Sequence, residues 1–313
     1  MLTPDDIADR TQRAVAAAAS AGRELGLRVD STRVLYDVFS VIVHLVPNPV
    51  VVRVPVVLPP AYSATPSVQT AQQRRELAVA GWLSDRGQTV VAPSPLVPRE
   101  PVLHQGFSMT FWQYVDELPN AEPDMPHRIE RTAHLHAALR DYPGDDLGFG
   151  APFGTFIPQG LDALTGRSEL LPEADLQRAQ QEWAAIAPIL TSRTGFESAF
   201  GGLDVQTIHG DAPYYNMIAT PDGELWSDFE LVTQGAVESD LAMVGEDGVA
   251  VYNAAATELG LRALDDRVLR VTETAARLGA IAALSMAPQL PMLIDSVAPV
   301  IEQWRSTAPF AHG

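Results

Sequence analysis

The sequence predicts an α+β protein with two lobes, a strand-rich first lobe and a larger, mainly helical second lobe. Three runs rich in β-branched residues follow one another closely, at residues 33–39, 41–46 and 50–57. Such runs favour β-strands, and the short links between them favour an antiparallel sheet. From residue 126 onward the apolar residues recur at helical spacing instead. Strands followed by helices in this order are typical of α+β proteins.

We expect the boundary between the lobes directly after Val115. The next five residues, Asp116 to Asn120, include two acids, a proline and an asparagine, and they interrupt a strand-like run. A chain of 313 residues is long enough for two lobes that share a cleft. The sequence therefore predicts a first lobe of residues 1–115 and a second lobe of residues 116–313.

The first lobe is expected to contain two helices beside its strands. The first helix should begin at Thr3-Pro4, where a capping hydroxyl precedes a proline and two acids, and end near Gly22. A proline-rich loop is expected over residues 59–67, and Thr65-Pro66 opens the second helix, which should end near Gly87. One face of that helix carries four residues at helical spacing, namely Gln72, Glu76, Val79 and Leu83.

The second lobe is expected to consist mostly of helices. Their predicted ranges are 128–140, 172–190, 239–258, 265–286 and 291–305. Residues 142–170 are rich in glycine, proline and aromatic residues, so we expect a loop or lid there.

Composition excludes several classes of protein. The net charge of −18 argues against a nucleic-acid partner, because phosphate backbones are bound by basic surfaces. The chain has no cysteine, which rules out disulfides and thiolate chemistry. All 21 basic residues are arginine, so the chain has no lysine. Neither a signal peptide nor a long apolar run is visible, and we expect a cytoplasmic protein without a membrane partner.

The most informative stretch runs from His209 to Glu230. Asp211 and Asn216 are five residues apart with a proline between them, a spacing that suits a rigid loop. Pro221-Asp222-Gly223 between two apolar runs predicts a hairpin, which would return Asp228 to the side of Asn216. Phosphoryl transfer needs a carboxylate near the acceptor hydroxyl and oxygen ligands that hold Mg²⁺ against the phosphates, and this loop could supply both.

This stretch resembles the motif of the aminoglycoside phosphotransferase family, which shares the two-lobed protein-kinase-like fold. The family pattern is His-Gly-Asp, four residues, Asn, and then Asp-x-Glu about a dozen residues later. The chain matches it with His209-Gly210-Asp211, Asn216 and Asp228-Phe229-Glu230.

The resemblance implies a role for each matching residue. Asp211 would be the catalytic base, and Asn216 and Asp228 would bind Mg²⁺. His209, Glu230 and Asp240 would support the site structurally; Asp240 lies in an Asp-Leu-Ala element that braces the catalytic loop in the family. On its own sequence, Asp240 could equally be a helix cap.

The resemblance also implies an ATP site in the first lobe. Arg53 stands where the fold usually has a lysine that contacts the inner phosphates, and it would pair with Glu76. No glycine lies between the first two strands, and Ser40 is a weak candidate phosphate contact there. The adenine would lie against the predicted strand 107–115, where Gln113, Tyr114 and Val115 provide backbone groups.

The expected function is transfer of the γ-phosphate of ATP, with Mg²⁺, to a hydroxyl of a small molecule such as an aminoglycoside, amino sugar, sugar or amino alcohol. The acidic chain is compatible with a cationic acceptor, and Asp145, Asp146, Glu238 and Glu246 are candidates to face it. The alternative is a non-catalytic nucleotide-binding pseudokinase or scaffold protein, which Arg53 and the glycine-free turn favour. The sequence leaves the oligomeric state open.

Overall fold

The structure is a computed structural model that describes residues 1–310, except for the side chains of residues 61 and 64. The chain forms two compact units. Unit 1 comprises residues 1–118, 219–225 and 286–292, and unit 2 comprises residues 119–218, 226–285 and the chain from residue 293 on. Two short segments from the second half of the chain therefore belong to unit 1. That residues 1–115 form a nucleotide-binding lobe and residues 116–313 a catalytic and substrate-binding lobe stays a prediction.

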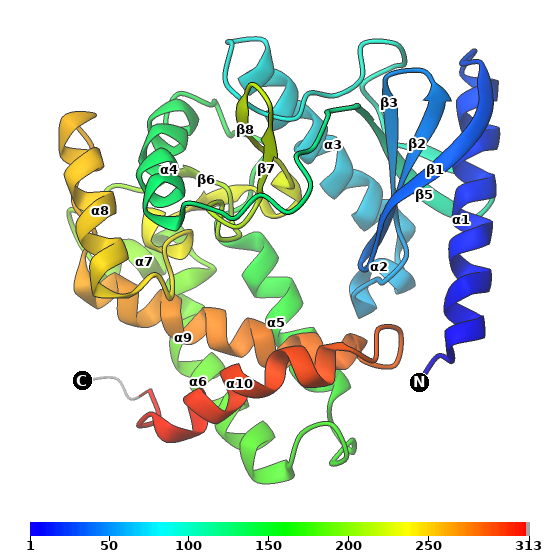
Figure 1. Cartoon of the computed structure of the whole chain (residues 1–313). Coiled ribbons are helices and arrows are strands. Elements are labelled where there is room, and N and C mark those ends of the chain that lie inside the picture. Colours follow the sequence, from blue (N-terminus) through cyan, green and yellow to red (C-terminus); the bar gives the residue numbers. More distant parts are fainter. Residues whose placement is uncertain (311–313) are drawn as a thin grey trace. The chain divides into compact units, whose positions relative to one another are not determined.

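Unit 1 contains a five-stranded antiparallel sheet (Figure 1). Its strands in spatial order are β1 (Val29–Asp37), β2 (Ser40–Pro47), β3 (Val50–Pro55), β5 (Phe107–Gln113) and β4 (Val102–His104). The first three strands form the predicted meander, because the strands are joined by very short turns. The N-terminal sheet and the mostly helical remainder confirm the predicted α+β class.

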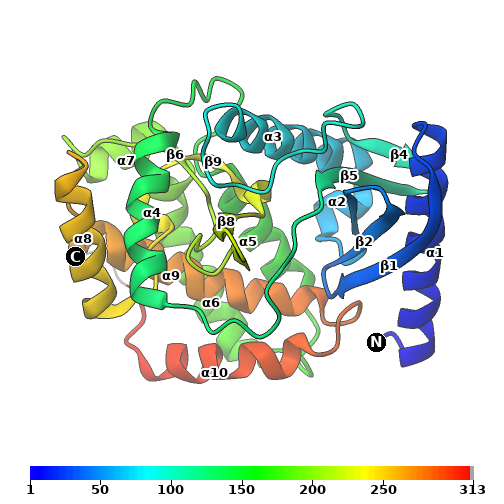
Figure 2. The same cartoon turned by 45° about the horizontal axis from the view of Figure 1, so that its top comes forward.

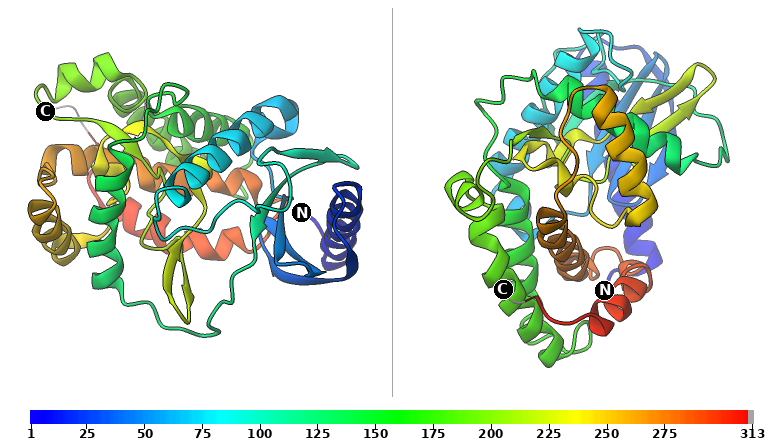
Figure 3. Two further views of the ribbon diagram at one scale, coloured as in Figure 1. Left: turned by 90° about the horizontal axis from the view of Figure 1, so that it is seen from above. Right: turned by 90° about the vertical axis from the view of Figure 1, so that its left-hand side faces the viewer.

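Helix α1 (Pro4–Glu24) covers one face of this sheet (Figure 3). It begins as predicted, with Thr3 and Asp6 forming a reciprocal capping box. Its buried face consists mainly of alanine, which lets the helix approach the strands closely. At Gly22 an added Cβ would lie only 2.6 Å from Leu45 Cδ1 of β2. On β2 and β3 the residues of this face are fully buried, namely Val41, Val43, Leu45, Val50, Val52 and Val54.

Helix α3 (Pro66–Ser84) carries the predicted buried face, with Gln72, Glu76, Val79 and Leu83 all shielded from solvent. Gln73 ties the helix to the sheet, because its Nε2 donates to the Ser108 carbonyl at 3.1 Å. The expected loop at residues 59–67 was only partly right. It contains a short helix, α2 (Pro60–Ala64), whose five residues are too few to produce a helical period in the sequence.

Unit 2 is built mostly from helices, listed here with its short strands. They are α4 (Met125–Leu139), α5 (Ala151–Ala163), α6 (Glu173–Leu190), α7 (Arg193–Ala199), β6 (Gln206–Ile208), η1 (Phe229–Leu231), β9 (Thr233–Gly235), η2 (Val237–Ser239), α8 (Gly245–Glu258), α9 (Asp266–Ala283) and α10 (Leu293–Ser306). The hairpin strands β7 (Met217–Thr220) and β8 (Gly223–Trp226) and the turn η3 (Leu284–Met286) cross the limits of the units. Figure 2 shows α4 and α8 side by side, with β6 and β9 near α4.

The expected loop or lid at residues 142–170 was wrong in its central part, which forms α5. The glycines and prolines of this segment are typical of loops, so the sequence did not indicate a helix here. Pro152 lies in the first turn, where proline is tolerated, and Pro158 lies inside the helix. Tertiary packing outweighs these residues, because Ile157 and Leu161 of α5 are buried in the main core cluster of unit 2. The short helix α7 was likewise not predicted.

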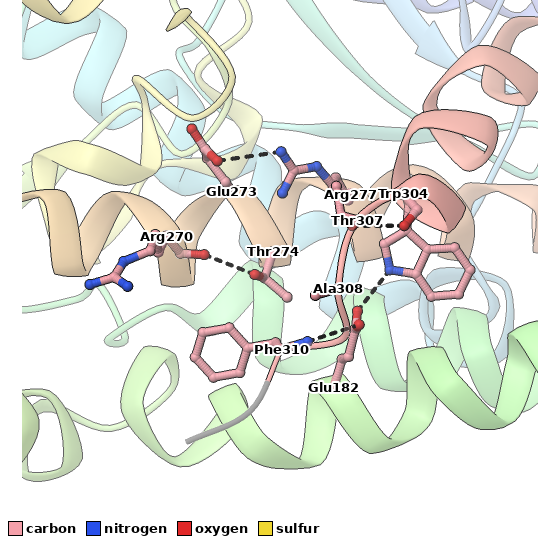
Figure 4. A pocket seen from close by; sticks show the side chains of 9 residues that line it. All are labelled: Glu182, Arg270, Glu273, Thr274, Arg277, Trp304, Thr307, Ala308 and Phe310. Carbon is pink, nitrogen blue, oxygen red and sulfur yellow. Dashed lines mark hydrogen bonds and ion pairs between the residues drawn. The ribbon is translucent and has the colours of Figure 1, made fainter. Parts of the chain in front are cut away.

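Hydrogen bonds to a buried carboxylate of α6 hold α10 and the segment that follows it (Figure 4). Glu182 accepts hydrogen bonds from Trp304 Nε1 at 2.7 Å and from the Phe310 amide at 3.1 Å, and Arg178 Nε binds it at 3.0 Å. A hollow of about 170 Å³ lies beside this junction, lined by Glu182, Arg270, Glu273, Thr274, Arg277, Trp304, Thr307, Ala308 and Phe310. It shares no residue with the stretch His209 to Glu230. Among the residues that the structure describes, no helix is long and apolar enough to cross a bilayer.

We expect Gly160→Ala to destabilise unit 2. Helices α5 and α9 cross so closely that a Cβ on Gly160 would lie 2.7 Å from both the Cβ and the carbonyl oxygen of Ala282. Overpacking of this kind costs about 1–3 kcal/mol, which exceeds the gain in helix propensity. Thermal or denaturant unfolding measures the difference.

Gly279→Ala is the matched control, because Gly279 also lies within a helix but a Cβ there meets no atom within 4 Å. This variant should gain up to about 1 kcal/mol from helix propensity alone. Equal effects of the two substitutions would contradict the close crossing of α5 and α9.

Candidate active site

A buried carboxylate fixes the loop that follows β6. Asp240 is fully buried, and its two oxygens accept the backbone amides of His209 at 2.8 Å and Gly210 at 2.7 Å. Burying a charged group is unfavourable unless hydrogen bonds compensate for the lost hydration. Asp240 therefore holds the start of the loop in one position, directly before Asp211.

A buried histidine ties this carboxylate to two helices. His136 of α4 is fully buried, with Nε2 3.0 Å from Asp240 Oδ2 and Nδ1 2.8 Å from the Tyr252 hydroxyl of α8. Facing a carboxylate, Nε2 donates its proton, and Nδ1 of the neutral ring then accepts from Tyr252. Burial raises the pKa of Tyr252, with the charges of Glu238 and Asp240 adding to the effect. The hydroxyl therefore stays protonated and able to donate.

Gly210 adopts a conformation that only glycine fits at this point. Its φ is +87°, and a Cβ would lie 2.0 Å from the carbonyl oxygen of Leu231. The backbone of the loop thus runs directly against the segment that follows the hairpin. Any side chain at residue 210 would push the two segments apart.

Asp211 and Asn216 lie together, as their spacing predicts. Asn216 Nδ2 is 3.3 Å from Asp211 Oδ2, 3.4 Å from the Ala212 carbonyl and 3.5 Å from the Asp211 carbonyl. The amide nitrogen therefore faces the loop. The amide oxygen, on the other side of the same planar group, is directed away from these partners and is available as a ligand.

The hairpin β7–β8 returns the chain to Asn216. The amide and the hydroxyl of Ser227 both donate to the Asn216 carbonyl, at 2.9 and 3.2 Å. His209 Nε2 donates to the Ser227 carbonyl at 3.0 Å, which joins the loop to the end of the hairpin. Asp228 follows directly and has φ +62°, a left-handed conformation that aspartate tolerates better than most residues. The hairpin therefore places Asp228 next to the Asn216 backbone.

The surroundings of Asp211 raise the pKa of its carboxyl group. Asp211 is exposed at the surface of the loop, yet protein packs densely around it, and this partial desolvation is the main cause. The negative charges of Glu230 and Asp240 act in the same direction, while His209 and the hydrogen bond from Asn216 oppose them. A carboxylate with a raised pKa is a stronger base than an ordinary aspartate.

The donor set at the hairpin fits a magnesium ion. Asn216 offers its amide oxygen and Asp228 a carboxylate, and Mg²⁺ accepts such hard oxygen ligands. Over residues 1–310, no cluster of three or more His, Cys, Asp or Glu side chains could hold a metal. Mg²⁺ does not require one, because it typically keeps several waters and binds substrate phosphates beside one or two protein ligands.

In unit 1, Arg53 and Glu76 form the predicted pair. Arg53 NH1 lies 2.9 Å from both carboxylate oxygens of Glu76, and the two side chains are only 14% and 2% exposed. The pair joins β3 to α3. Glu76 thereby holds one edge of the Arg53 guanidinium in place, on the face of the sheet opposite α1.

The structure narrows the other predicted nucleotide contacts. The amides of Gln113 and Tyr114 donate to the carbonyls of Ala92 at 2.9 Å and Pro49 at 3.0 Å. Neither amide is available to an incoming base. A contact of the base with other backbone groups of Gln113, Tyr114 and Val115 stays a prediction. Ser40 is buried at the start of β2.

One acidic residue suggested as an acceptor contact was wrong. Glu238 is fully buried and binds both terminal nitrogens of Arg262, at 2.5 and 2.8 Å. It also accepts the Asp265 amide at 2.8 Å, which fixes the start of α9. This carboxylate is structural.

Comparisons with known proteins identify the family of the chain. A model of the phosphotransferase enzyme family, APH, matches residues 33–278, which is most of the chain. The chain belongs to the phosphotransferase enzyme family. A search of curated proteins finds no match to this phosphotransferase.

Solved structures similar to this phosphotransferase are kinase-like enzymes. The choline kinase LicA from Streptococcus pneumoniae is 11% identical with a TM-score of 0.59, over 92% of this chain and 99% of that chain. The GDP and kanamycin complex of APH(2")-IIia is 14% identical with a TM-score of 0.59, over 90% and 94%. Aminoglycoside phosphotransferase APH(3'')-Id from Streptomyces rimosus ATCC10970 is 17% identical with a TM-score of 0.54, over 84% and 96%. These similarities confirm the protein-kinase-like fold.

Sequence reasoning missed two residues that support the phosphotransferase loop, His136 and Tyr252. From sequence alone, His136 is not singled out among the residues of its helix. Its position seven residues after Ile129, on the apolar face of α4, was a signal that it would be buried. No local signal could have identified its partners, because Asp240 is 104 residues away and Tyr252 is 116 residues away.

We expect Gly210→Ala to destabilise the phosphotransferase by at least about 3 kcal/mol, because a strained φ and a clash with a backbone carbonyl act together. Gly202→Ala is the matched control: its φ is +86°, but no atom lies within 4 Å of an added Cβ. The free energy of unfolding of that variant should fall by only about 1–2 kcal/mol. Chemical denaturation of both proteins tests this, and similar losses would show that the loop is not packed against Leu231.

We expect Asp211→Asn to stabilise the fold wherever the Asp211 carboxyl group of the unmodified protein is ionised. A raised pKa means that the folded state holds the Asp211 proton more tightly than the unfolded state, so ionisation destabilises the native protein above the folded pKa. The advantage of the variant in Tm should therefore be full at pH values above the folded pKa. It should shrink as the pH falls through the folded pKa towards the ordinary aspartate value of about 3.9. A Tm advantage that grows on acidification would contradict the direction of the shift.

Proposed function

We propose that this phosphotransferase transfers the γ-phosphate of ATP, with Mg²⁺, to a hydroxyl group of a small molecule. The observation that carries the proposal is the loop of unit 2, which presents Asp211 beside Asn216 and receives Asp228 from the hairpin. Phosphoryl transfer depends on positioning and charge stabilisation more than on covalent chemistry, and a rigid loop with these groups provides both.

In the proposed mechanism Asp211 orients the acceptor hydroxyl and takes its proton as transfer proceeds. Its raised pKa makes the ionised carboxyl group a stronger base, which favours this proton transfer. The hydrogen bond from Asn216 limits rotation of the carboxylate. When bound at Asn216 and Asp228, Mg²⁺ would supply positive charge against the phosphate oxygens.

Arg53 would hold the inner phosphates of the nucleotide. Its planar guanidinium can bind phosphate through two parallel hydrogen bonds, whereas lysine provides a point charge. Glu76 holds one terminal nitrogen of the group, so its orientation is fixed before a nucleotide arrives. In a chain without lysine, arginine at this position follows the general composition and does not by itself indicate a lost activity.

The proposed acceptor is an amino sugar, a sugar or an amino alcohol. The names of the similar structures include aminoglycoside phosphotransferases and a choline kinase, whose substrates share a hydroxyl group and a positively charged nitrogen. The net charge of −18 favours the approach of a cationic acceptor.

The second candidate function is nucleotide binding without transfer. Two observations favour it: the β1–β2 turn contains no glycine, and Arg53 replaces the usual lysine. The retained set of Asp211, Asn216 and Asp228 argues against it, because a protein that only binds nucleotide has no need for a catalytic base.

Asp211→Asn separates the two functions. If the chain is a phosphotransferase, we expect ATP-dependent phosphorylation of amino-sugar or amino-alcohol acceptors to fall by roughly 10²- to 10⁴-fold, the usual contribution of a general base. The affinity for ATP and Mg²⁺, measured by calorimetry, should change little. Chelation of Mg²⁺ should abolish transfer in the unmodified protein.

Asp222→Asn is the matched control, because this exposed aspartate lies in the turn of the same hairpin and contacts no proposed site group. It should leave turnover unchanged. Undiminished turnover in Asp211→Asn would remove the base from the mechanism, and ATP binding without turnover on any acceptor of these classes would favour the binding function.

A further inference from the structure

The turn between β1 and β2 is held in place by α1. Thr11 Oγ1 lies 2.6 Å from Asp37 Oδ2, and its other neighbour, the Ile7 carbonyl, is farther away at 2.9 Å. A hydroxyl has one proton, and the shorter contact to a charged acceptor is the stronger one. Arg10 NH2 adds an ion pair to Asp37 at 3.6 Å.

Arg10 is itself fixed, which makes this anchor rigid. Its side chain is only 10% exposed, and NH1 donates to the Gln289 carbonyl at 3.2 Å. Gln289 in turn binds the backbone of Leu58 through both its side-chain amide atoms, at 2.9 and 3.2 Å. The anchor of Asp37 is therefore part of a connected network within unit 1.

The other side of the turn is bonded to the end of β3. The Phe39 carbonyl accepts the amides of Val56 at 2.9 Å and Val57 at 3.0 Å. Asp37, Val38, Phe39 and Ser40 include no glycine, so the turn also lacks the conformational freedom that glycine would give it. Contacts on both sides thus restrain a segment that would be a mobile flap if it were rich in glycine.

The anchored turn determines where Tyr36 lies. Tyr36 pairs with Ile42, and Ile42 pairs with Arg53, so the three residues form one row across the strands. Directly paired residues point to the same face of a sheet, and successive residues point to opposite faces. Asp37 faces α1, so Tyr36 lies on the opposite face with Arg53. Tyr36 is exposed, with 58% of the residue accessible to solvent.

We propose that α1 braces this turn so that Tyr36 is a fixed nucleotide contact at the phosphate end of the Arg53 face. The hydroxyl of Tyr36 donates a hydrogen bond to a phosphate or ribose oxygen and takes the place of backbone amides that a glycine-rich turn would provide. Thr11 and Asp37 are positioning residues that act through the turn. This inference rests on the proposed nucleotide-dependent function, but the brace can be tested without any turnover.

Hydrogen exchange of the protein without nucleotide tests the brace. In Thr11→Val we expect the amides of Val56 and Val57 to exchange roughly ten-fold faster, because loss of a hydrogen bond to a charged group releases the turn. Val52, in the middle of β3, should not change. Thr257→Val is the matched control, since Thr257 Oγ1 bonds the carbonyl of Asn253, four residues earlier in its own helix. Unchanged exchange at Val56 and Val57 would overturn the brace whatever the activity of the chain.

Calorimetry with ATP and Mg²⁺ tests the Tyr36 contact. Tyr36→Phe keeps the ring and should weaken binding by roughly five- to ten-fold through loss of one hydrogen bond, with the Tm unchanged. Thr11→Val should raise KM for ATP while kcat and KM for the acceptor stay constant. Tyr142→Phe, the same chemical change in unit 2, should have no effect on ATP affinity.

Equal ATP affinity in Tyr36→Phe and the unmodified protein would overturn the contact while leaving the proposed function intact. Absence of ATP binding in the unmodified protein would overturn both the proposed function and the Tyr36 contact. The exchange experiment would then still decide whether α1 braces the turn.

Discussion

The loop that carries the proposed base of this phosphotransferase depends on one buried negative charge, that of Asp240. A carboxylate with no access to water must be fully hydrogen-bonded, and this requirement specifies where its donors lie. Two of the donors are the backbone amides that precede Asp211, and the third is His136. The position of the proposed base is thus set by the backbone and by the core of unit 2. Small rearrangements of exposed side chains would not move it.

The hydrogen-bond network that begins at Asp240 continues from the loop to the hairpin. His209 joins the loop to the end of the hairpin, and the Asn216 backbone joins it again through Ser227. Asp211 and Asn216 come from the loop after β6 and Asp228 from the end of the hairpin, yet both segments are linked to this network through backbone atoms. A site built in this way keeps its geometry while the side chains that contact the acceptor vary, which fits a family whose members act on different small molecules.

Much of this arrangement could be predicted from local sequence. The spacing of Asp211 and Asn216 and the Pro-Asp-Gly turn place the hairpin correctly, because both depend on short-range backbone geometry. The partner of Arg53 was also predictable, since Glu76 is on the buried face of a recognisable helix. His136 and Tyr252 were not, because only the tertiary fold brings them to Asp240. Helix α5 was not predicted because its prolines and glycines indicate a loop. Its apolar residues form a helix because they pack into the core of unit 2, and that packing cannot be read from the local sequence.

The pairing of Arg53 with Glu76 has a consequence for chemical intervention. Many covalent reagents for kinase-like proteins, such as aldehydes and sulfonyl fluorides, form a bond to the nucleophilic amine of the strand lysine. A guanidinium is a far weaker nucleophile, and no side chain of this chain offers an amine. Electrophiles that require an amine would therefore find no such group at Arg53. Dicarbonyl compounds, which condense with guanidinium groups, are the reagents suited to the proposed nucleotide-binding face around Arg53.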